Sequence, residues 1–352
     1  MRFIYRSILL LLLAALTIGA TGCSITKKQT SQTDGGFYAS TDFGENWKQK
    51  VFVNKEKNGI RTIASVGTKK MIFDPLTRSR VYLLSSANGI YVSSNRGEQW
   101  TPTGLSTGSY VDLSIDYRNN AVLYATQGTK ILKSVDEGVR WSEIYTETRP
   151  DQKLVSVQVS PTNSPIVYAA SNGGILKSTD YGNTWKLLDW TMPAITQLRV
   201  SERSGNTLYA LTSSGIYKST DGAQTWNIIT DPLKNFPGAL KILWFNFDQR
   251  NEHIILGTAY GVLRSTDGGS TWNEIPTLFD FKKVPIVAVI DHPNDLNRIV
   301  FAVKNVLHKT DDGGLTWKTI KTVGTSRSIN YLINDPEIVD SIYVGTQEPP
   351  KK

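Results

Sequence analysis

One short motif recurs seven times along the chain and constrains the fold more than any other feature. A hydroxyl residue is followed at +2 by Asp, at +4 by Gly and at +7 by Trp, as in Ser40-Thr41-Asp42-Phe43-Gly44-Glu45-Asn46-Trp47, with Asn95 replacing the Asp in one copy and Ala223 replacing the Gly in another. The acidic or amide position and the tryptophan of each copy are Asp42 and Trp47, Asn95 and Trp100, Asp136 and Trp141, Asp180 and Trp185, Asp221 and Trp226, Asp267 and Trp272, and Asp312 and Trp317. The six intervals between these tryptophans average 45 residues, which is typical of the blades of a β-propeller.

Each copy of the motif is surrounded by short runs of apolar residues that indicate four strands. An inner strand ends at a polar turn, as at Met71-Ile72-Phe73-Asp74, and a second strand follows, as at Val81-Tyr82-Leu83. A third strand, such as Gly89-Ile90-Tyr91-Val92, leads into the motif, and the outermost strand begins at the tryptophan. β-branched and aromatic residues separated by Gly, Asn and Asp favour strands and tight turns. The sequence therefore predicts an all-β protein built of four-stranded antiparallel blades.

The two ends of the repeat region complement each other. The first copy begins at its third strand, Gly36 to Ala39, whereas the last residues supply only a first and a second strand, near 329–333 and 341–344. Together they make one complete blade and leave no long open edge. We therefore predict a single closed seven-bladed propeller over residues 36–347, with one blade formed jointly by the N- and C-terminal strands and a basic tail at 348–352.

The residue types of the motif suit a structural turn. An Asp carboxylate can accept backbone N–H bonds, Gly can adopt a positive φ, and Trp buries a large ring while keeping one N–H to satisfy. Five further acidic residues follow inner strands: Asp74, Asp116, Asp248, Asp291 and Asp335. Because they recur from blade to blade, we interpret them as turn residues rather than catalytic ones.

The N-terminus has the features of a secretion signal. Arg2 and Arg6 precede an apolar run, residues 8–16, which is too short to span ~30 Å of hydrocarbon. Gly19-Ala20-Thr21-Gly22-Cys23 resembles a bacterial lipobox, although Ala20 stands where Leu is usual. We expect a signal peptide at 1–22, a lipidated Cys23 and a flexible tether at 23–35, which would place the protein outside the cytoplasm on a bacterial membrane. An ordinary cleaved signal peptide with an incidental Cys is the alternative.

Composition excludes several classes of site. A single Cys cannot form an intramolecular disulfide, and three scattered histidines weaken any histidine-based metal site. Lys and Arg number 39 against 31 Asp and Glu, a balance that does not indicate nucleic-acid binding. No Gly-Lys-Ser/Thr follows the Gly pairs, so they are not phosphate loops. We expect no metal, no cofactor and no nucleic-acid partner, and a monomeric chain.

The motif Ser-x-Asp-x-Gly-x-x-Trp resembles the Asp-box, or BNR, repeat of sialidases, sortilin-type receptor domains, xyloglucan hydrolases and photosystem II stability/assembly-factor-like propellers. The resemblance covers residues 36–347. In size, single-domain plan and lipobox-like N-terminus the chain is most similar to the assembly-factor-like propellers. The resemblance implies that the Asp-boxes lie in peripheral turns away from the ligand site. It also implies a non-enzymatic, lipid-anchored protein that binds an envelope or membrane protein or assists the assembly of a complex.

The alternative is a glycoside hydrolase or a carbohydrate-binding propeller. A sialidase would carry an Arg-Ile-Pro motif near the start of the propeller, and the chain contains none. A xyloglucanase-type enzyme would use two carboxylates across a groove and usually has two propellers. This chain is long enough for only one.

A binding surface is expected where residues break the repeat. Loops from an outer strand to the next inner strand share one face of a propeller with the turns between second and third strands. Aromatic residues and Arg are favoured at protein interfaces. The predicted partner-binding residues are Arg61, in the long loop Asn54 to Val66, together with Trp190, Trp244, Tyr260, Phe281 and Lys282. Core packing of Trp244 and capping of a blade by Trp190 are the competing interpretations.

Overall fold

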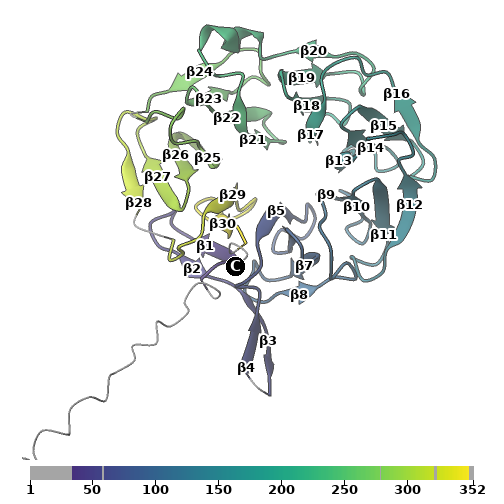
Figure 1. Cartoon of the computed structure of the whole chain (residues 1–352), viewed down its shortest axis with the longest axis horizontal. Helices are drawn as coiled ribbons and strands as arrows, with labels where there is room; N and C mark the ends of the chain where they lie inside the picture. Colours follow the sequence, from purple (N-terminus) through teal and green to yellow (C-terminus); the bar gives the residue numbers. More distant parts are fainter. Residues whose placement is uncertain (1–33, 58, 278, 321–322, 349–352) are drawn as a thin grey trace, which may run out of the picture. The chain divides into compact units, whose positions relative to one another are not determined.

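The predicted strands pair into seven four-stranded antiparallel sheets, arranged as a ring around a central channel (Figure 1). The computed structural model describes residues 34–57, 59–277, 279–320 and 323–348. The expected signal peptide, Cys23 and nearly all of the tether lie outside these residues. Within the described part of the chain, no helix is long and apolar enough to cross a membrane.

Six of the blades are continuous in sequence, and their strands follow one another from the channel outward. Four of them are β5 (Thr68–Phe73), β6 (Val81–Ser85), β7 (Ile90–Ser93) and β8 (Thr101–Pro102); β9 (Asp112–Ile115), β10 (Leu123–Gln127), β11 (Lys130–Ser134) and β12 (Ser142–Thr146); β13 (Leu154–Val159), β14 (Val167–Ser171), β15 (Gly174–Ser178) and β16 (Lys186–Leu188); and β17 (Ile195–Val200), β18 (Leu208–Thr212), β19 (Gly215–Ser219) and β20 (Asn227–Ile228). The next two are β21 (Ile242–Asp248), β22 (His253–Thr258), β23 (Val262–Ser265) and β24 (Asn273–Ile275); and β25 (Ala288–His292), β26 (Asp295–Val303), β27 (Val306–Thr310) and β28 (Lys318–Ile320). A 3₁₀ turn, η2 (Asp231–Asn235), lies between β20 and β21.

The seventh blade joins the two ends of the propeller, as the sequence predicts. Its strands are β29 (Ile329–Asn334), β30 (Ile342–Thr346), β1 (Phe37–Ser40) and β2 (Lys48–Gln49). Strand β1 pairs antiparallel with β30, with Tyr38 opposite Val344. Tyr38 and Val344 are both buried, so the seam is part of the core. The predictions of seven blades and of a shared closing blade are confirmed.

The second strands form the most regular layer of the core. Five of the seven blades place a tyrosine at the equivalent position of this strand: Tyr82, Tyr124, Tyr168, Tyr209 and Tyr343. Each of these tyrosines is at most 2% exposed. Large aromatic rings packed between neighbouring sheets bury much apolar surface, and they hold adjacent blades together.

Basic residues near the ends of the third strands add a second link between blades. Lys133 Nζ donates to the carbonyl of Tyr181 at 2.8 Å, and Lys218 Nζ donates to the carbonyl of Gly268 at 3.2 Å. Each lysine thus reaches the motif turn of the next blade. Lys309 makes the equivalent link across the closing seam, to Glu45 at 2.6 Å.

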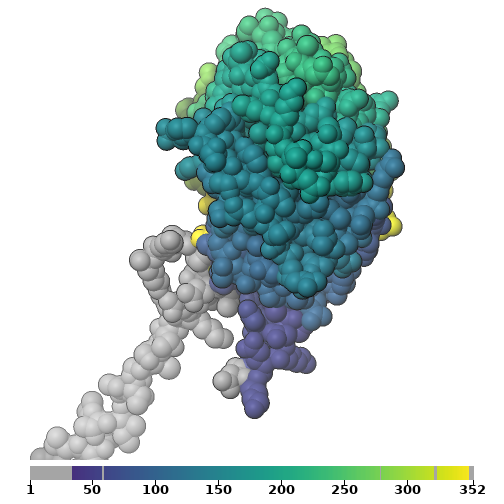
Figure 2. Space-filling view, turned by 90° about the vertical axis from the view of Figure 1, so that its right-hand side faces the viewer, coloured from purple at the N-terminus to yellow at the C-terminus, as the bar shows by residue number. Residues whose placement is uncertain are grey.

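The segment predicted as the long loop Asn54 to Val66 contains a two-stranded hairpin, β3 (Phe52–Glu56) and β4 (Gly59–Thr62). The hairpin projects from the rim of the disc in Figure 1 and beyond its body in Figure 2. Its base is anchored: Trp100 Nε1 donates to the carbonyl of Lys50 at 2.9 Å, and the Trp100 ring is fully buried. The predicted long loop therefore contains a regular hairpin, because residues on its two arms pair with each other.

Candidate functional site

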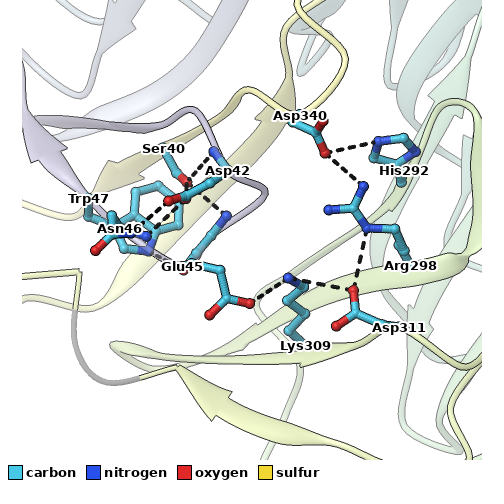
Figure 3. Close-up of polar contacts among 11 residues, drawn as sticks. Ser40, Asp42, Glu45, Asn46, Trp47, His292, Arg298, Lys309, Asp311 and Asp340 are labelled. Atoms are coloured by element: carbon cyan, nitrogen blue, oxygen red, sulfur yellow. Dashed lines mark hydrogen bonds and ion pairs between the residues drawn. The ribbon is translucent and has the colours of Figure 1, made fainter.

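The motif turns use their carboxylates internally. In the first turn, Ser40 Oγ donates to Asp42 Oδ1 at 2.7 Å, and the backbone N–H of Asn46 donates to the same oxygen at 2.9 Å (Figure 3). Trp47 Nε1 closes the turn on the carbonyl of Gly44 at 2.9 Å. In two later turns, hydrogen bonds from Thr184 to Asp180 and from Thr316 to Asp312 hold the pKa of each carboxyl at about 2. These acids stay ionised and engaged, which gives them a structural role.

Most of the acidic residues after inner strands are also engaged in their own turns. Asp74 accepts backbone N–H bonds from Leu76 and Thr77, Asp248 accepts one from Arg250, and Asp335 accepts them from Glu337 and Ile338. Asp116 does the same with Arg118.

Asp291 is an exception, and its interpretation as a turn residue is wrong. In that blade His292 takes the turn position, because its Nδ1 accepts the backbone N–H of Asn294 at 3.2 Å. Asp291 instead occupies the strand position that holds Phe73 or Phe247 in other blades, where its Oδ2 is buried without a hydrogen-bond partner. Burial raises the pKa of this carboxyl.

The channel is where the repeat loses its regularity. One equivalent position of the inner strands, set by the pairing register with the second strands, carries a different residue in every blade: Lys70, Asp112, Ser156, Gln197, Trp244, Ala288 and Tyr331. We call these seven positions the channel ring; five of them line the central cavity, whereas Ser156 and Ala288 are fully buried and do not. In five blades a register shift lies directly before this position. Such β-bulges re-aim side chains and are common beside functional sites.

One side of the channel ring is charged and fully hydrogen-bonded. Lys70 Nζ forms an ion pair with Asp112, whose other oxygen accepts from Ser156 Oγ, from the Val157 N–H at 3.2 Å and from Gln158 Nε2 at 3.2 Å. Burial opposes ionisation of Asp112, but the positive neighbours and these donors outweigh it and keep its pKa below the ordinary value. Burial lowers the pKa of Lys70 to about 8.

Arg199 adds a second cation to this side. It follows Gln197 by two residues on β17, and its charge acts on both Lys70 and Asp112. Its guanidinium donates to the carbonyl of Leu198 at 3.0 Å and to Gln197 Oε1 at 3.2 Å, which are both uncharged acceptors. One carboxylate, Asp112, thus stands near two cations but pairs only with Lys70, and the cluster carries an excess positive charge.

The opposite side of the channel ring is aromatic. The Trp244 and Tyr331 rings meet edge to face with centroids 5.4 Å apart. Trp244 Nε1 is buried and has no hydrogen-bond partner, and the same is true of Asn334 Oδ1, elsewhere in the lining. An unmade hydrogen bond in a buried site is costly.

These side chains line a cavity of about 660 Å³ in the channel. At one end its lining includes Lys69 and Lys70, near the start of β5. At the other end it includes Arg78 and Arg250, which lie in the turns after β5 and β21. Across residues 34–57, 59–277, 279–320 and 323–348, no carboxylate lies at ion-pair distance from Arg78 or Arg199. Such a channel can hold an anionic group against Lys70 and Arg199 and an apolar group against Trp244 and Tyr331.

The six residues predicted to bind a partner do not form one site. Trp190 packs on Trp226, with centroids 5.3 Å apart, and its Nε1 donates to its own loop. This arrangement agrees with the capping interpretation. Tyr260 belongs to the β21–β24 blade, away from Trp190, and donates to Glu274 of the same blade at 2.9 Å. Arg61 lies on the projecting hairpin. Trp244 is the one member that reaches the channel.

Phe281 and Lys282 are neighbours with opposite environments. Lys282 is exposed, whereas Phe281 is only 2% exposed and packs edge to face on Phe301. Phe281 therefore supports the core rather than a partner surface, and its assignment to an interface is corrected. It was misjudged because an aromatic residue in a loop beside lysines looks exposed in sequence.

Lys70, Asp112, Arg199 and Tyr331 were not among the predicted site residues. The signal that could have found them is the alignment of the seven inner strands. The position of Lys70, Asp112 and Tyr331 varies in charge, size and polarity from blade to blade, and so does the position two residues later, which holds Arg199. Among the described residues, no group of three or more His, Cys, Asp or Glu side chains is placed to hold a metal ion.

Solved structures similar to this chain include two kinds of protein. YCF48 bound to D1 peptide aligns with a TM-score of 0.62 and 13% identity, covering 89% of this chain and 97% of that one. YCF48 from Cyanidioschyzon merolae aligns at 0.58 and 13%, covering 80% and 96%. The GH74 xyloglucanase from Xanthomonas campestris aligns at 0.62 and 15%, covering 86% of this chain but 52% of the enzyme, so this chain spans about half of it. At these identities the likeness shows the fold.

Comparison with curated proteins gives no match. The model of the DUF6242 beta propeller domain matches residues 114–329, which is more than half of the chain. The matched segment runs from β9 to the start of β29 and includes most of the channel lining. The chain therefore belongs to the DUF6242 beta propeller domain family.

Proposed function

We propose that this protein is a non-enzymatic binding propeller that holds an acidic, extended segment of a partner protein in its central channel. The observation that carries the proposal is the position of Arg199, which faces the cavity beside Lys70 without a carboxylate of its own. Arg in a partly desolvated site binds carboxylates strongly and in a fixed geometry. The aromatic pair Trp244 and Tyr331 would receive an apolar side chain of the same segment.

Peptide binding is also consistent with the structural likeness. One of the similar propellers was solved with a peptide bound, and it matches this chain over nearly its whole length. In line with the N-terminal sequence, we further propose that the chain is lipid-anchored through Cys23 outside the cytoplasm of a bacterial cell, with an envelope or membrane protein as its partner.

Hydrolysis of glycosides is less well supported by the geometry. A glycosidase uses two carboxyl groups that flank the scissile bond. In the cavity lining, Asp112 is held by Lys70, Glu202 lies 3.5 Å from Arg250, and Asp248 caps a turn. Asp335 is bound by Arg96 at 3.1 Å, which leaves Asp291 as the single carboxyl of the lining without a partner.

Selection of a displayed peptide library on the full-length protein tests this function. We expect enrichment of peptides that combine acidic residues with an aromatic or aliphatic one, and at least tenfold weaker binding of those peptides to Arg199→Gln. Arg140→Gln is the matched control, because Arg140 is exposed in a motif turn and pairs with Asp136. Failure to select any peptide, together with release of reducing sugar from a polysaccharide panel, would establish the enzymatic alternative instead.

A further inference from the structure

The β3–β4 hairpin is the one projecting element of the described chain, and its tip has an unusual composition. Residues 54–57 and 59–62 are all exposed, so neither face of the hairpin packs on the propeller. Lys55, Lys57 and Arg61 supply three positive charges against one acid, Glu56. Ile60, opposite Lys55 in the pairing, is 63% exposed. Across the described ranges, no ion pair engages any of these four charged side chains.

The base of the hairpin packs on the propeller, in contrast to its exposed tip. Val53 and Ile63 are buried, at 7% and 1% exposure. The backbone N–H of Trp100 donates to the carbonyl of Phe52 at 2.8 Å, and Gln99 Nε2 donates to the carbonyl of Val53 at 3.0 Å. A two-stranded hairpin is marginal by itself in water, so this anchoring explains why it persists. The tip is therefore presented in a fixed direction.

Lysines on an exposed strand edge are a common protection against aggregation. That role does not account for Ile60, because an exposed β-branched residue on an edge works against such protection. A second copy of the hairpin is also a poor partner, because both would carry the same positive charge. An aliphatic tip flanked by cations instead matches an anionic lipid surface, which attracts Lys and Arg and accepts apolar side chains at its interface.

The path of the N-terminal part of the chain also supports a lipid surface as the partner of the hairpin tip. The first described residues run past the base of the hairpin: a side chain at Gly36 would meet Val51 and the carbonyl of Ile63, and Gln49 Nε2 donates to the carbonyl of Gly35. From Asp34 back to Cys23 the tether can span at most roughly 40 Å. The hairpin arms reach roughly 14 Å beyond their base. A chain attached to a membrane near Cys23 would therefore keep this tip within reach of the lipid surface.

We propose that the β3–β4 hairpin is a membrane-contact element, whose tip places Ile60 at the interface of an anionic leaflet while Lys55, Lys57 and Arg61 bind its headgroups. The contact orients the propeller on the membrane. It is independent of the peptide site in the channel, since none of these residues lines the cavity. The N-terminal attachment brings the protein to the surface, and the hairpin sets which side of the disc faces it.

A depth-sensitive probe tests the contact. An environment-sensitive fluorophore is attached to Ile60→Cys in the full chain, with Cys23→Ser so that position 60 carries the single thiol. A histidine tag at the N-terminus, bound by nickel-chelating lipid, replaces the attachment that this substitution removes. Emission and quenching of the probe are measured on tethering vesicles with 30% phosphatidylserine and on tethering vesicles whose other lipid is phosphatidylcholine alone. Leu315→Cys is the matched control, because Leu315 is 78% exposed in a motif turn between β27 and β28.

We expect a blue shift and quenching by lipid-borne quenchers at position 60 but not at position 315, on the anionic vesicles. Lys55→Gln, Lys57→Gln and Arg61→Gln combined should reduce the quenched fraction more than tenfold, because each cation near an anionic leaflet strengthens binding several-fold. Equal emission at positions 60 and 315 on the tethered chain, or an unchanged signal in the triple variant, would overturn the proposal. Peptide binding by the triple variant should stay unchanged, which separates this proposal from the channel function.

Discussion

Lys309 Nζ lies 2.6 Å from Glu45 Oε1 and so connects strand β27 to the first motif turn of the chain (Figure 3). The lysine side chain is only 5% exposed and also faces Asp311 at 3.5 Å. Arg298 continues the network, because it lies 3.4 Å from Asp311 and 2.7 Å from Asp340. This chain of ion pairs crosses the junction between the β25–β28 blade and the closing blade.

A double-mutant cycle with Lys309→Met and Glu45→Gln should measure a favourable coupling of about 0.5–1 kcal/mol in the free energy of unfolding. The value is modest because Glu45 is 53% exposed and water screens the pair. The control cycle uses Lys130 and Glu143, which are exposed on one blade, and should give a coupling near zero. A coupling no larger at the seam than in the control would show that the network does not support closure.

Asp180→Asn should change how stability depends on pH. The folded-state pKa of Asp180 is about 2, below the ordinary ~3.9 of an unfolded chain. The stability that its ionised form contributes is therefore present above about pH 4 and is lost as the pH falls toward 2. Urea midpoints of wild type and variant should differ most at pH 5–7 and converge near pH 2. A difference that stays constant over this range would contradict the role of the carboxylate.

Binding of an acidic peptide should weaken as the pH rises through 8. Burial and the nearby Arg199 lower the pKa of Lys70 to about 8, so this cation is lost from the channel well below the pH at which an exposed lysine is neutralised. We expect several-fold weaker affinity at pH 9 than at pH 7. Lys70→Gln should bind more weakly at pH 7 and show a flat profile over the same interval. A pH dependence that persists in Lys70→Gln would assign it to another group.

The sequence predicts the fold well because every blade repeats the same requirements. The motif residues Asp42 and Trp47 recur at a fixed interval, and the incomplete copies at both ends require β1 to pair with β30. Regularity of this kind identifies a scaffold. It also hides the site, because the residues that differ between blades carry no motif.

The candidate site was therefore harder to predict than the fold. Arg199 and Lys70 lie far apart in sequence, and only closure of the ring brings them to one channel. Phe281 and Asp291 were misassigned for a related reason. Tertiary packing decides that the loop residue Phe281 is buried, and it decides that the turn after β25 begins one residue later, at His292 instead of Asp291. The hairpin at Phe52 to Thr62 was missed because its short arms alternate weakly in polarity.

The most direct test of the central claim is photo-crosslinking from inside the channel. Benzoylphenylalanine replaces Trp244 in the full-length protein, and peptides selected from the displayed library are added under light. We expect crosslinks from position 244, a loss of at least tenfold when Arg199→Gln is introduced, and none from benzoylphenylalanine at Leu315, in an exposed motif turn. Crosslinks of equal yield from position 315, or none from position 244 despite measurable binding, would show that the partner segment does not enter the channel.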